Sequence, residues 1–576
     1  MHVSLLCRIV CNRYRQEVDS LKLFGLFESP NPRAAWRVPA SSDAILFDRH
    51  AIKAHNIAYS DNLFAASTAD NAKEVLEAYA IWGDEFPLHL DIPCVCALWD
   101  FGKSCFFVSR DPLGEIPIYY ACDGNGVAFT DWLPSLLLSR ICEPVMDSNA
   151  LNELISIGPA RTPGRTFVAG IHSLKPGCML VGNAREPVSL VQYYSLHAEQ
   201  HTDSETHTAE VVRTLLEDAM KLYLSKPCAL MLSGGLDSTI LTALAMKLDG
   251  IADTYSIEYE NAKDHFTGSA FQPELDSPYV TLAVQSLKCR HRRVILTEDQ
   301  LAESLEDAMQ ARGMPGMGDV DSSFLLFSRA ISGHAARVIS GECGDEVFGG
   351  YPWFRTEAPN ITFFPWSGSM DLREMILLPK VREKLNPRCY AQERFDEAVS
   401  ELPTLPEEPE HERLLRKIQN LCFMFFMPNL QERAYHMCRA AGLQIFTPYS
   451  YLPLVEYAYN IPWSMKFLKG YEKGLLREAA RDLLPPDLLY RKKSPYPKTW
   501  NPEYMRLVSS QFEAIAQDRT SPLRQFIDFD AVRRFSRCAS PAADPWFGQL
   551  MTAPQMLAYL IQTDQWMRTY GIELSL

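Results

Sequence analysis

A stretch of ten residues, Leu230-Met-Leu-Ser-Gly-Gly-Leu-Asp-Ser-Thr239, constrains this chain more than any other. The uncharged run from Cys228 to Leu232 has the length and composition of a buried strand. Small residues follow it, and the run from Ser238 to Met246 predicts a helix. Because a strand that turns directly into a helix leaves free backbone N–H groups at the turn, we expect a ligand to bind there.

The turn itself carries the chemistry of anion binding. Gly234 and Gly235 let the backbone approach a ligand closely, while Ser233 and Ser238 add hydroxyl donors. The helix directs its N–H groups and the positive end of its dipole at the turn, which favours phosphate. No Gly-Lys-Ser/Thr follows, so this is not a kinase-type phosphate loop. Asp237 would repel bare phosphate, and we expect it to hold Mg²⁺ that the phosphates share.

A second stretch with similar chemistry is Ser340-Gly-Glu-Cys-Gly-Asp-Glu-Val-Phe-Gly-Gly-Tyr351. It follows a short apolar run, Ala336–Ser340, that predicts another strand. A solvated acidic loop is the alternative, but several glycines at a strand end favour a site. Strands and helices alternate in this part of the chain, so both stretches are expected at the carboxyl edge of one parallel sheet. Asp345 would then be a second Mg²⁺ carboxylate opposite Asp237.

With both stretches considered, the chain resembles a known family. The first string resembles the pyrophosphate-binding loop of enzymes that split ATP between the α and β phosphates and adenylate a substrate. The second resembles the motif Ser-Gly-Glu-x-x-Asp-Glu-x-Phe-Gly-Gly-Tyr of the asparagine synthetase family. Three further segments agree with that family and extend the resemblance over residues from about 95 to 505: Pro315–Phe324, Tyr471–Arg477 and Arg491–Lys498.

The first part of the chain resembles the class II glutamine amidotransferase domains that accompany such synthetases, in Ala78–Gly83, Ala97–Asp100 and Arg110–Tyr120. The resemblance implies a two-domain α/β protein. Residues 1–195 would form an N-terminal-nucleophile-like αββα sandwich. Residues 205–576 would form the ATP-pyrophosphatase (synthetase) domain, an α/β domain of the adenine-nucleotide α-hydrolase type with a parallel sheet and a helical C-terminal part.

The family also implies roles for individual residues. Lys473 would neutralise charge at the α-phosphate, and Glu342 would position the attacking amine. Tyr351, Gln444 and Phe446 are predicted to line the substrate pocket. Lys492, Lys493 and Lys498 receive no role. The ATP and pyrophosphate contacts are expected from Leu232, Ser233, Gly234, Gly235, Asp237, Ser238, Ile257, Ser340 and Gly341.

Periodicity supports this division of the chain. Residues up to about 195 carry short apolar runs that predict strands, with one helix at Ala69–Ile81. A polar stretch, Ser195–Thr208, is expected to link the domains. The strands predicted from sequence are Ser4–Val10, Ala44–Phe47, Val95–Trp99, Cys105–Ser109, Pro117–Tyr120, Gly126–Phe129 and Cys178–Val181 in the first domain, then Thr254–Tyr259 and Arg293–Leu296. The helices predicted in the second domain are Ala209–Tyr223, Tyr279–Leu287, Glu298–Ala311 and Phe324–Gly333.

Composition bounds the class of protein. The 576 residues suffice for two full domains, and a hydrophobic content of 47% is ordinary for a globular chain. The net charge of −15 argues against nucleic acid or an anionic membrane as a partner. The 15 cysteines, with no secretory signal, suggest reduced thiols and a cytoplasmic protein. The expected partners are a small-molecule or peptide carboxylate and, in addition, a second copy of the chain or a biosynthetic partner protein.

The first domain departs from the amidotransferase pattern. Family members that hydrolyse glutamine begin Met-Cys-Gly, and the cysteine exposed after removal of Met is the nucleophile. Here the sequence reads Met1-His2-Val3. The family's glutamine-binding strings are absent from residues 20–70, and its glutamine-holding aspartate falls on Asn71. We therefore expect a degenerate domain without glutaminase activity.

The second domain departs too. The family's Leu-Glu-x-Arg-Val-Pro-Phe-x-Asp corresponds here to Leu443-Gln-Ile-Phe-Thr-Pro-Tyr-Ser-Tyr451, so that Phe446 stands in place of an arginine near the aspartate substrate. The family's Asp-Arg pair falls on Tyr435-His436. Phenylalanine cannot grip a carboxylate as arginine does, so these changes predict a larger, less acidic substrate. The alternative is repacking of a position behind the pocket.

Three functions are compatible with these features. The first is an ATP-dependent amide ligase that adenylates a carboxylate and uses an amine from a source other than glutamine. That amine could belong to the substrate itself, as in the β-lactam synthetases and lasso-peptide macrolactam cyclases, whose glutaminase domains are also degenerate. The second is an asparagine synthetase that uses free ammonia or supplied glutamine nitrogen. The third is a non-catalytic ATP-binding scaffold, which has no need for Asp237, Asp345 and Lys473.

Overall fold

The computed structural model describes residues 5–10, 22–27, 57–60, 63–67, 71–100, 102–123, 126–183, 188–268, 272–355, 360–368, 370–403, 405–538 and 545–576. The described chain divides into two compact units. Unit 1 contains residues up to Glu153, Arg161–Ser195 and Thr569–Leu576; unit 2 contains Leu154–Ala160 and Leu196–Arg568. The residues predicted as strand Ala44–Phe47, together with Met1–Val3, lie outside the described residues.

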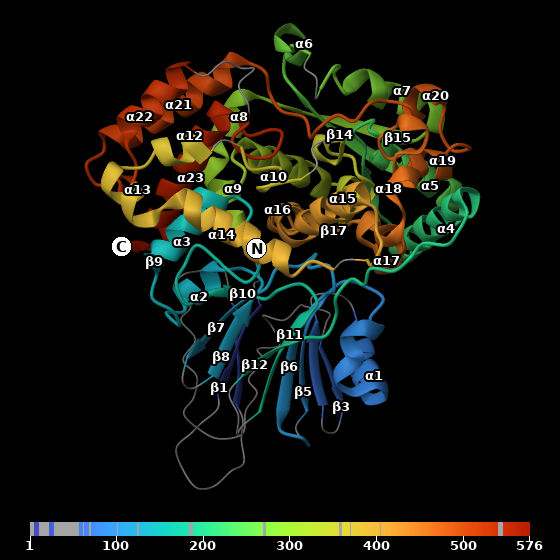
Figure 1. Ribbon diagram of the computed structural model, residues 1–576, viewed down its shortest axis with the longest axis horizontal. Helices are drawn as coiled ribbons and strands as arrows, with labels where there is room; N and C mark the ends of the chain where they lie inside the picture. Colours follow the sequence, from blue (N-terminus) through green and yellow to red (C-terminus); the bar gives the residue numbers. More distant parts are fainter. Residues whose placement is uncertain are drawn as a thin grey trace. The chain divides into compact units, whose positions relative to one another are not determined.

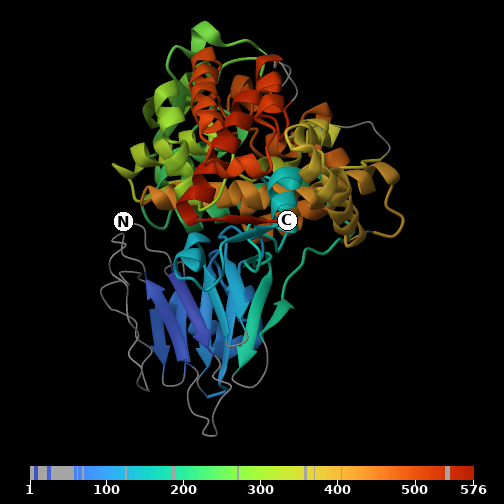
Figure 2. The same cartoon turned by 90° about the vertical axis from the view of Figure 1, so that its left-hand side faces the viewer.

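Unit 1 contains two antiparallel sheets, drawn mainly in blue in Figure 1 and seen from another side in Figure 2. The first has the strand order β10-β7-β8-β1-β2 and the second the order β12-β11-β6-β5-β4-β3. The bounds of the strands are β1 Leu5–Val10, β2 Lys22–Phe27, β3 Ile57–Ser60, β4 Leu63–Ser67, β5 Val95–Asp100, β6 Cys105–Arg110, β7 Tyr119–Asp123, β8 Gly126–Thr130, β10 His172–Ser173, β11 Cys178–Asn183 and β12 Ser189–Gln192. A separate parallel pair joins β9 Val145–Asp147 to β18 Glu573–Ser575.

The two sheets share a core because strand β5 is apolar on both faces. Val95, Ala97 and Trp99 pack with residues of the first sheet such as Val127 and Phe129. The alternate residues of β5 face the other way, onto helix α1 (Ala72–Trp82), where Leu98 packs in one cluster with Val75, Leu76, Tyr79 and Phe107. Unit 1 also contains η1 Gly83–His89, α2 Pro134–Leu138 and α3 Ser148–Asn152, and a π-helical segment, η2 Glu153–Ile157, leads into unit 2.

Unit 2 is built on a parallel sheet with the strand order β15-β14-β13-β16-β17. Strands β13 (Ala229–Met231), β14 (Asp253–Tyr259) and β15 (Arg290–Leu296) follow one another outward in chain order. Strands β16 (Arg337–Ile339) and β17 (Gln444–Phe446) are added on the other side of β13. The winding direction therefore reverses between β13 and β16, and ligands of such sheets bind at the carboxyl ends of the strands at this point.

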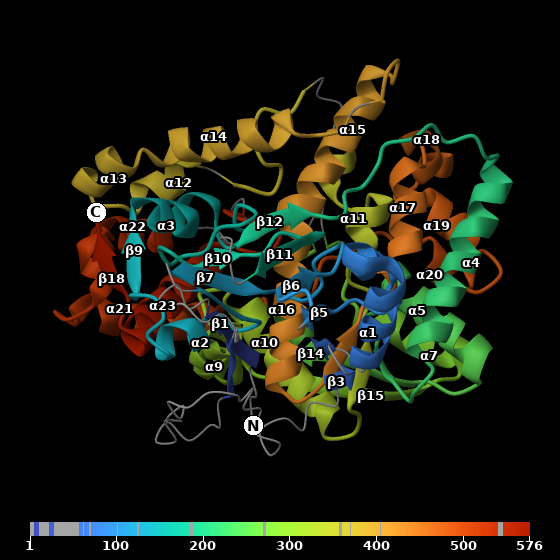
Figure 3. The ribbon, with the colours of Figure 1, turned by 90° about the horizontal axis from the view of Figure 1, so that it is seen from below.

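Helices make up most of the rest of unit 2. Among them, α4 packs against α5, α17 and α19, which Figure 3 shows gathered at one end of the unit. The bounds of those before β17 are α4 Glu205–Tyr223, α5 Leu236–Asp249, α6 Ala262–His265, α7 Ser277–Leu287, α8 Glu298–Glu303, α9 Leu305–Arg312, α10 Asp319–Ser332, α11 Gly344–Phe348, η3 Pro352–Arg355, α12 Met370–Met375, α13 Pro379–Leu385, α14 Pro387–Ser400, α15 Glu410–Leu421, η4 Cys422–Phe426 and α16 Met427–Ala440.

The helices after β17 are η5 Pro448–Ser450, α17 Leu452–Asn460, α18 Trp463–Lys466, η6 Leu468–Gly470, α19 Gly474–Ala479, α20 Pro486–Leu489, α21 Pro502–Gln517, η7 Pro522–Gln525, α22 Phe529–Cys538 and α23 Ala553–Tyr570. None of the helices in the described residues is long and apolar enough to cross a membrane.

The predicted parallel sheet and helical C-terminal part are confirmed, while several boundaries differ. Helix α4 begins within the predicted linker Ser195–Thr208, because the Ser204 hydroxyl accepts a hydrogen bond from the His207 amide and caps the helix. The predicted helix Glu298–Ala311 is two helices that meet at Ser304. Strand β17 is absent from the sequence prediction, since three residues carry too little periodicity.

Candidate active site

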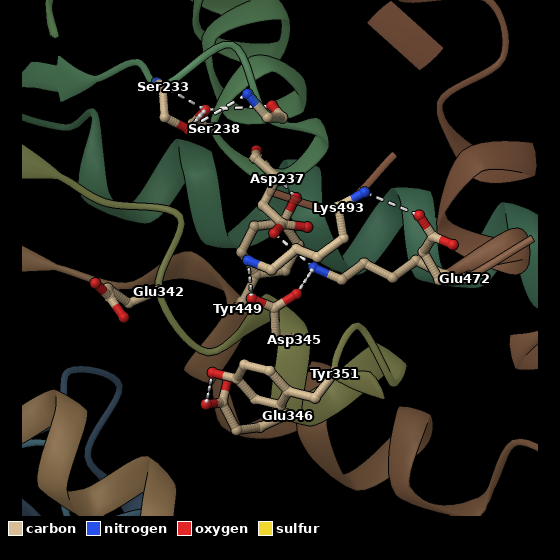
Figure 4. A network of polar contacts seen from close by, with 12 residues as sticks. Ser233, Asp237, Ser238, Glu342, Asp345, Glu346, Tyr351, Tyr449, Glu472 and Lys493 are labelled. Carbon is tan, nitrogen blue, oxygen red and sulfur yellow. Dashed lines mark hydrogen bonds and ion pairs between the residues drawn. The ribbon is translucent and has the colours of Figure 1, made fainter. Parts of the chain in front are cut away.

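The turn after β13 is held by a network of serine hydrogen bonds (Figure 4). The Ser233 amide donates to the Ser238 hydroxyl oxygen at 3.1 Å, and the two hydroxyl groups lie 3.0 Å apart. The Gly235 amide donates to the Ser233 hydroxyl at 3.3 Å. The serine side chains therefore fix the shape of the turn at the N-terminus of α5, where the free N–H groups of the helix favour an anion.

The glycine at position 234 is required by the close approach of a second helix. Its φ is +69°, and a Cβ there would lie 2.6 Å from the amide nitrogen of Val280 on α7. A side chain would thus be strained twice, by the backbone conformation and by contact with main-chain atoms. Gly234 therefore shapes the turn from behind rather than by facing the cavity in front of it.

Two carboxylates and two ammonium groups meet where the two predicted stretches face each other. Lys473 Nζ lies 2.5 Å from Asp237 Oδ2 and 2.5 Å from Asp345 Oδ1. Lys493 Nζ lies 2.5 Å from Asp345 Oδ2 (Figure 4). Asp345 is therefore held by both lysines. Three of these side chains are at most 15% exposed, and Lys493 is 21% exposed. The cluster is thus a compact, partly desolvated network in which each charge depends on the others.

These surroundings set the protonation of the carboxyl groups. Burial alone would raise the pKa of Asp345, but the adjacent Lys473 and Lys493 outweigh it and lower that pKa to about 2. Burial raises the pKa of Asp237, which also faces Asp345, although Lys473 acts in the opposite direction. Burial, with the nearby Asp345, raises the pKa of Glu346 to about 8, and this carboxyl accepts a hydrogen bond from Tyr351 Oη at 2.7 Å. Asp345 is therefore the most strongly ionised group of the cluster.

A cavity of about 220 Å³ opens in front of this cluster and collects most of the residues predicted from sequence. Lys473 reaches it from a left-handed backbone conformation with φ of +54°. Gly350 leaves room for the cluster, because a Cβ there would lie 1.9 Å from Asp345 Oδ1. The predicted residues that line the cavity are Leu232, Ser233, Gly235, Asp237, Ser238, Ile257, Ser340, Gly341, Glu342, Asp345, Tyr351 and Lys473.

The cavity also contains an ion pair, apart from the aspartate–lysine cluster, whose arginine the sequence does not indicate. Arg433 of α16 is 2% exposed, and its Nη2 donates to Glu342 Oε1 at 2.7 Å. The guanidinium lies 5.2 Å from the ring centroids of both Phe324 and Tyr496. Arg433, Phe324 and Tyr496 all line the cavity. Glu342 is thus paired with a buried arginine.

The structure places two predicted pocket residues elsewhere. Phe446 is buried, but its ring stacks on Tyr223 of α4 with centroids 5.0 Å apart, and the Arg337 guanidinium lies 4.5 Å from it. Gln444 is exposed at the start of β17. Neither residue lines the cavity, whereas Tyr351 does. The structure therefore places Phe446 and Gln444 outside the cavity lining, and the expectation that they contact the substrate stays a prediction.

Two further basic residues of the cavity, Lys493 and Arg491, come from a segment for which the sequence indicates no role. Arg491 Nη1 donates to the carbonyl of Ser233 at 3.2 Å, and its Nη2 pairs with Asp276. Arg491 therefore links the turn after β13 to the loop before α7. The sequence signal is the basic run Arg491–Lys498, but a basic run alone does not tell a solvated face from a site.

The residues present fit a divalent cation bound together with phosphates. Asp237 Oδ1 is buried and has no hydrogen-bond partner, and Lys473 is the cation that Asp237 and Asp345 share. Among the described residues, no three His, Cys, Asp or Glu side chains gather as a metal site by themselves. A cation here would thus need oxygen ligands from a bound molecule, as Mg²⁺ does with nucleotide phosphates.

Family models match both units of the chain. The model described as asparagine synthase matches residues 211–568, and the model of the glutamine amidotransferase domain matches residues 50–194. This chain belongs to the asparagine synthetase family. It is 36% identical over 508 residues to "Asparagine synthetase [glutamine-hydrolyzing] 3" of Bacillus subtilis, a match that spans 87% of this chain and 82% of the relative.

More distant relatives carry similar names. A putative glutamine-hydrolyzing asparagine synthetase of Mycobacterium tuberculosis is 22% identical over 470 residues, 75% of this chain and 70% of that protein. Asparagine synthetase B of Escherichia coli is 25% identical over 331 residues, 55% of this chain and 52% of that protein. The protein is therefore an enzyme, an ATP-dependent carbon–nitrogen ligase of the asparagine synthetase type.

Proposed function

We propose that this enzyme adenylates a carboxylate substrate in the cavity of unit 2 and joins it to an amine that is not released from glutamine by unit 1. The observation that carries the adenylation is the meeting of Asp237, Asp345, Lys473 and Lys493 at the serine-rich turn. The lysines and the serine-rich turn suit the phosphates of a nucleoside triphosphate, and the two carboxylates suit a divalent cation.

The cavity residues divide into three groups in this proposal. Ser233, Gly235 and Ser238 hold the pyrophosphate portion of ATP. Leu232, Ile257, Ser340 and Gly341 hold adenine and ribose, and Asp237 and Asp345 hold Mg²⁺. The cation, when bound, neutralises phosphate charge and favours departure of pyrophosphate. Lys473 Nζ remains beside the α-phosphate and stabilises the charge that develops there.

The proposed reaction has two steps, adenylation of the carboxylate and attack of the amine on the acyl adenylate. A carboxylate oxygen of the substrate attacks the α-phosphorus, the bond to the bridging oxygen breaks, and pyrophosphate leaves. The amine attacks the acyl carbon, loses a proton, and AMP departs with the former carboxylate oxygen. Glu342, fixed by its ion pair with Arg433, faces the cavity where the amine must approach. The amine is supplied either as a separate molecule or by the acyl substrate itself, which would give a macrolactam or β-lactam type ring.

The state of Asn71 supports an amine source other than glutamine. By the family resemblance this residue replaces the aspartate that holds glutamine. Its side chain is 2% exposed, accepts a hydrogen bond from the Ser67 hydroxyl at 2.6 Å and donates to Cys94 Sγ at 3.6 Å. The side-chain amide is thus uncharged, and it already makes hydrogen bonds with Ser67 and Cys94 of unit 1. We propose that unit 1 is an amidotransferase-like sandwich that has lost glutaminase activity.

A second candidate is an asparagine synthetase that uses ammonia or glutamine nitrogen. One observation favours it: the cavity does contain a buried arginine, Arg433, so the loss of arginine at position 446 does not remove carboxylate recognition. The names of these relatives also describe glutamine-hydrolyzing asparagine synthetases. The two candidates differ in whether glutamine is consumed.

The test measures pyrophosphate and glutamate release in the same reaction. The protein is incubated with ATP, Mg²⁺ and a panel of carboxylates, each with ammonia, glutamine or no added amine. We expect pyrophosphate release with at least one acid and no glutamate above the level in buffer. Glutamate release that a thiol-alkylating glutamine analogue abolishes would establish the second candidate. Absence of pyrophosphate with every acid would reject adenylation of these acids.

A further inference from the structure

Helix α11, which carries Asp345, is only five residues long. A single turn of helix is not stable by itself, so other parts of the protein must hold it in place. After the helix, the amides of Gly349 and Gly350 both donate to the carbonyl of Asp345, at 3.0 and 2.9 Å. The carbonyls that follow at the C-terminal end of such a helix need hydrogen-bond donors from outside the helix.

The side chain of Gln419, on α15, supplies these donors. Its Nε2 donates to the carbonyl of Glu346 at 3.2 Å and to the carbonyl of Val347 at 3.0 Å. Gln419 is 0% exposed, so water does not reach these hydrogen bonds. The glutamine therefore anchors the C-terminal end of α11 to α15.

Lys466 of α18 determines which way the amide of Gln419 points. Its Nζ donates to Gln419 Oε1 at 3.1 Å. Because the amide oxygen is taken by this donor, the NH₂ group is directed at the two carbonyls of α11. With the amide reversed, its oxygen would face two carbonyl oxygens. Lys466 thus acts on α11 through Gln419.

The burial of Lys466 is costly for the fold. The residue is 0% exposed, and within the described part of the chain it forms no ion pair. Burial, with the nearby Arg416, lowers the pKa of its amino group well below the ordinary value. The ring of Trp463, 4.4 Å from Nζ, is its other close contact. An apolar side chain would avoid this cost, so the hydrogen bond to Gln419 is what a lysine adds here.

We propose that Gln419 and Lys466 are positioning residues for the metal site, which hold the end of α11 so that Asp345 can share a cation with Asp237. Neither of them lines the cavity, so neither acts on a substrate directly. The inference rests on the proposed role of Asp345 as a ligand of Mg²⁺. This cation tolerates little departure from octahedral geometry, so a loosened α11 should weaken its binding.

The experiment measures two properties of the same variants. Hydrogen exchange of the Gly349 and Gly350 amides in the ligand-free protein reports how firmly the end of α11 is held. Calorimetry with an ATP analogue that cannot release pyrophosphate, at increasing Mg²⁺, gives the Mg²⁺ concentration for half-maximal binding. In Gln419→Met we expect faster exchange and a higher Mg²⁺ concentration, each by a factor of about 10, as for the loss of buried hydrogen bonds.

Lys466→Met should change both properties in the same direction by a factor of about three, since the amide of Gln419 is then held less firmly. The double variant should resemble Gln419→Met alone, because Lys466 acts through Gln419. If Gln419→Met does not fold, Lys466→Met takes its place in the test.

Asn420→Leu is the matched control, at the next residue of α15. The buried Asn420 side chain donates to the Arg416 carbonyl at 2.9 Å and accepts from Tyr459 Oη at 3.1 Å, away from α11. This variant should lose stability and keep the wild-type Mg²⁺ dependence. Unchanged Mg²⁺ dependence in Gln419→Met, or an equal shift in Asn420→Leu, overturns the proposal. A wild type that binds the analogue equally well without Mg²⁺ rejects the proposed metal site itself, which the exchange rates do not depend on.

Discussion

Unit 1 and unit 2 each contain a buried arginine and an aspartate that is at least partly buried, but the two units use these residues differently. In unit 1, Arg110 donates to the carbonyls of Ile116, Leu174 and Gly114 at 2.9, 2.6 and 2.7 Å. Its neighbour Asp111 accepts from the amides of Leu113, Glu115 and Ile116. In unit 2, Arg433 Nε and Asp237 Oδ1 are buried without any partner.

This comparison distinguishes charged side chains that stabilise a loop from charged side chains that remain able to bind a ligand. A charged side chain whose hydrogen bonds are all made by the backbone stabilises the fold and has nothing left to offer a substrate. A buried charge with an unsatisfied atom beside a cavity costs stability unless a ligand pairs with it. Substitutions in the two units should therefore affect different measurements.

The largest effect is expected for Asp237→Asn. Removing one of the two carboxylates leaves a bound cation less well balanced, so pyrophosphate release should fall by a factor of roughly 10² to 10³. The measurement is the initial rate of pyrophosphate formation with a saturating acid. Asp253→Asn, which removes an exposed carboxylate paired with Arg290, should leave the rate unchanged. An unaltered rate in Asp237→Asn would mean that the metal site lies elsewhere.

Arg110→Met should act on stability instead. It leaves three carbonyls, two of them in buried hydrogen bonds, without their donor and Asp111 without its neighbouring charge, which should lower the free energy of unfolding of unit 1 by about 3 kcal/mol. Denaturant titration followed by a probe in unit 1 measures this. Lys103→Met, at an exposed position of the same unit, should cost less than about 1 kcal/mol. A loss of ATP binding without loss of stability would contradict the structural role of Arg110.

Phe446→Arg tests whether position 446 contacts the substrate. The new guanidinium would replace a ring that stacks on Tyr223, so we expect a loss of about 2–3 kcal/mol in unfolding free energy. It should not alter the relative kcat/KM for different acids, since position 446 does not line the cavity. Phe446→Leu provides a control that keeps the position apolar. A gain of aspartate selectivity in Phe446→Arg would return this residue to the substrate pocket.

The smallest effect concerns His291, a half-buried group of unit 2 that does not itself line the cavity. Its ring nitrogens lie 2.9 Å from the Thr254 hydroxyl and 3.0 Å from the Ser256 hydroxyl. Burial, with the nearby Arg293, lowers the pKa of this histidine from 6.5 to about 4. Between these values the unfolded chain binds the proton and the folded chain does not, so stability falls as pH decreases from 6.5 toward 4.

His291→Gln should remove this dependence and flatten the plot of unfolding free energy against pH, by roughly 1–2 kcal/mol at about pH 5. The midpoint of denaturant unfolding at about pH 5 and about pH 7 measures it. An equal slope in the wild type and His291→Gln would show that the buried ring is protonated in the folded state.

The stretches Leu230–Thr239 and Ser340–Tyr351 are predictable from sequence because the residues that form each of them are neighbours in the chain. A strand, small residues and a helix within Leu230–Thr239 determine both the local fold and the chemistry of the turn. Arg433 and Lys493 could not be found this way. Each lies in an element whose own pattern fits an ordinary helix or loop, and only the assembled sheet brings it to the cavity. The position of Phe446 outside the cavity lining could not be predicted for a related reason, because the alignment of a strand residue does not show which face of the sheet its side chain takes.

The reversal of winding direction between β13 and β16 has a consequence for the order in which the protein forms. A growing chain can assemble β13, β14 and β15 with their helices as soon as these are made, because the pairing partners are close in sequence. One flank of β13 then stays an open edge until β16, the next strand of the sheet along the chain, has been made. Lys473 and Lys493 arrive later still. The nascent enzyme must therefore protect an unfinished sheet whose anionic pair, Asp237 and Asp345, has not yet met its counterions.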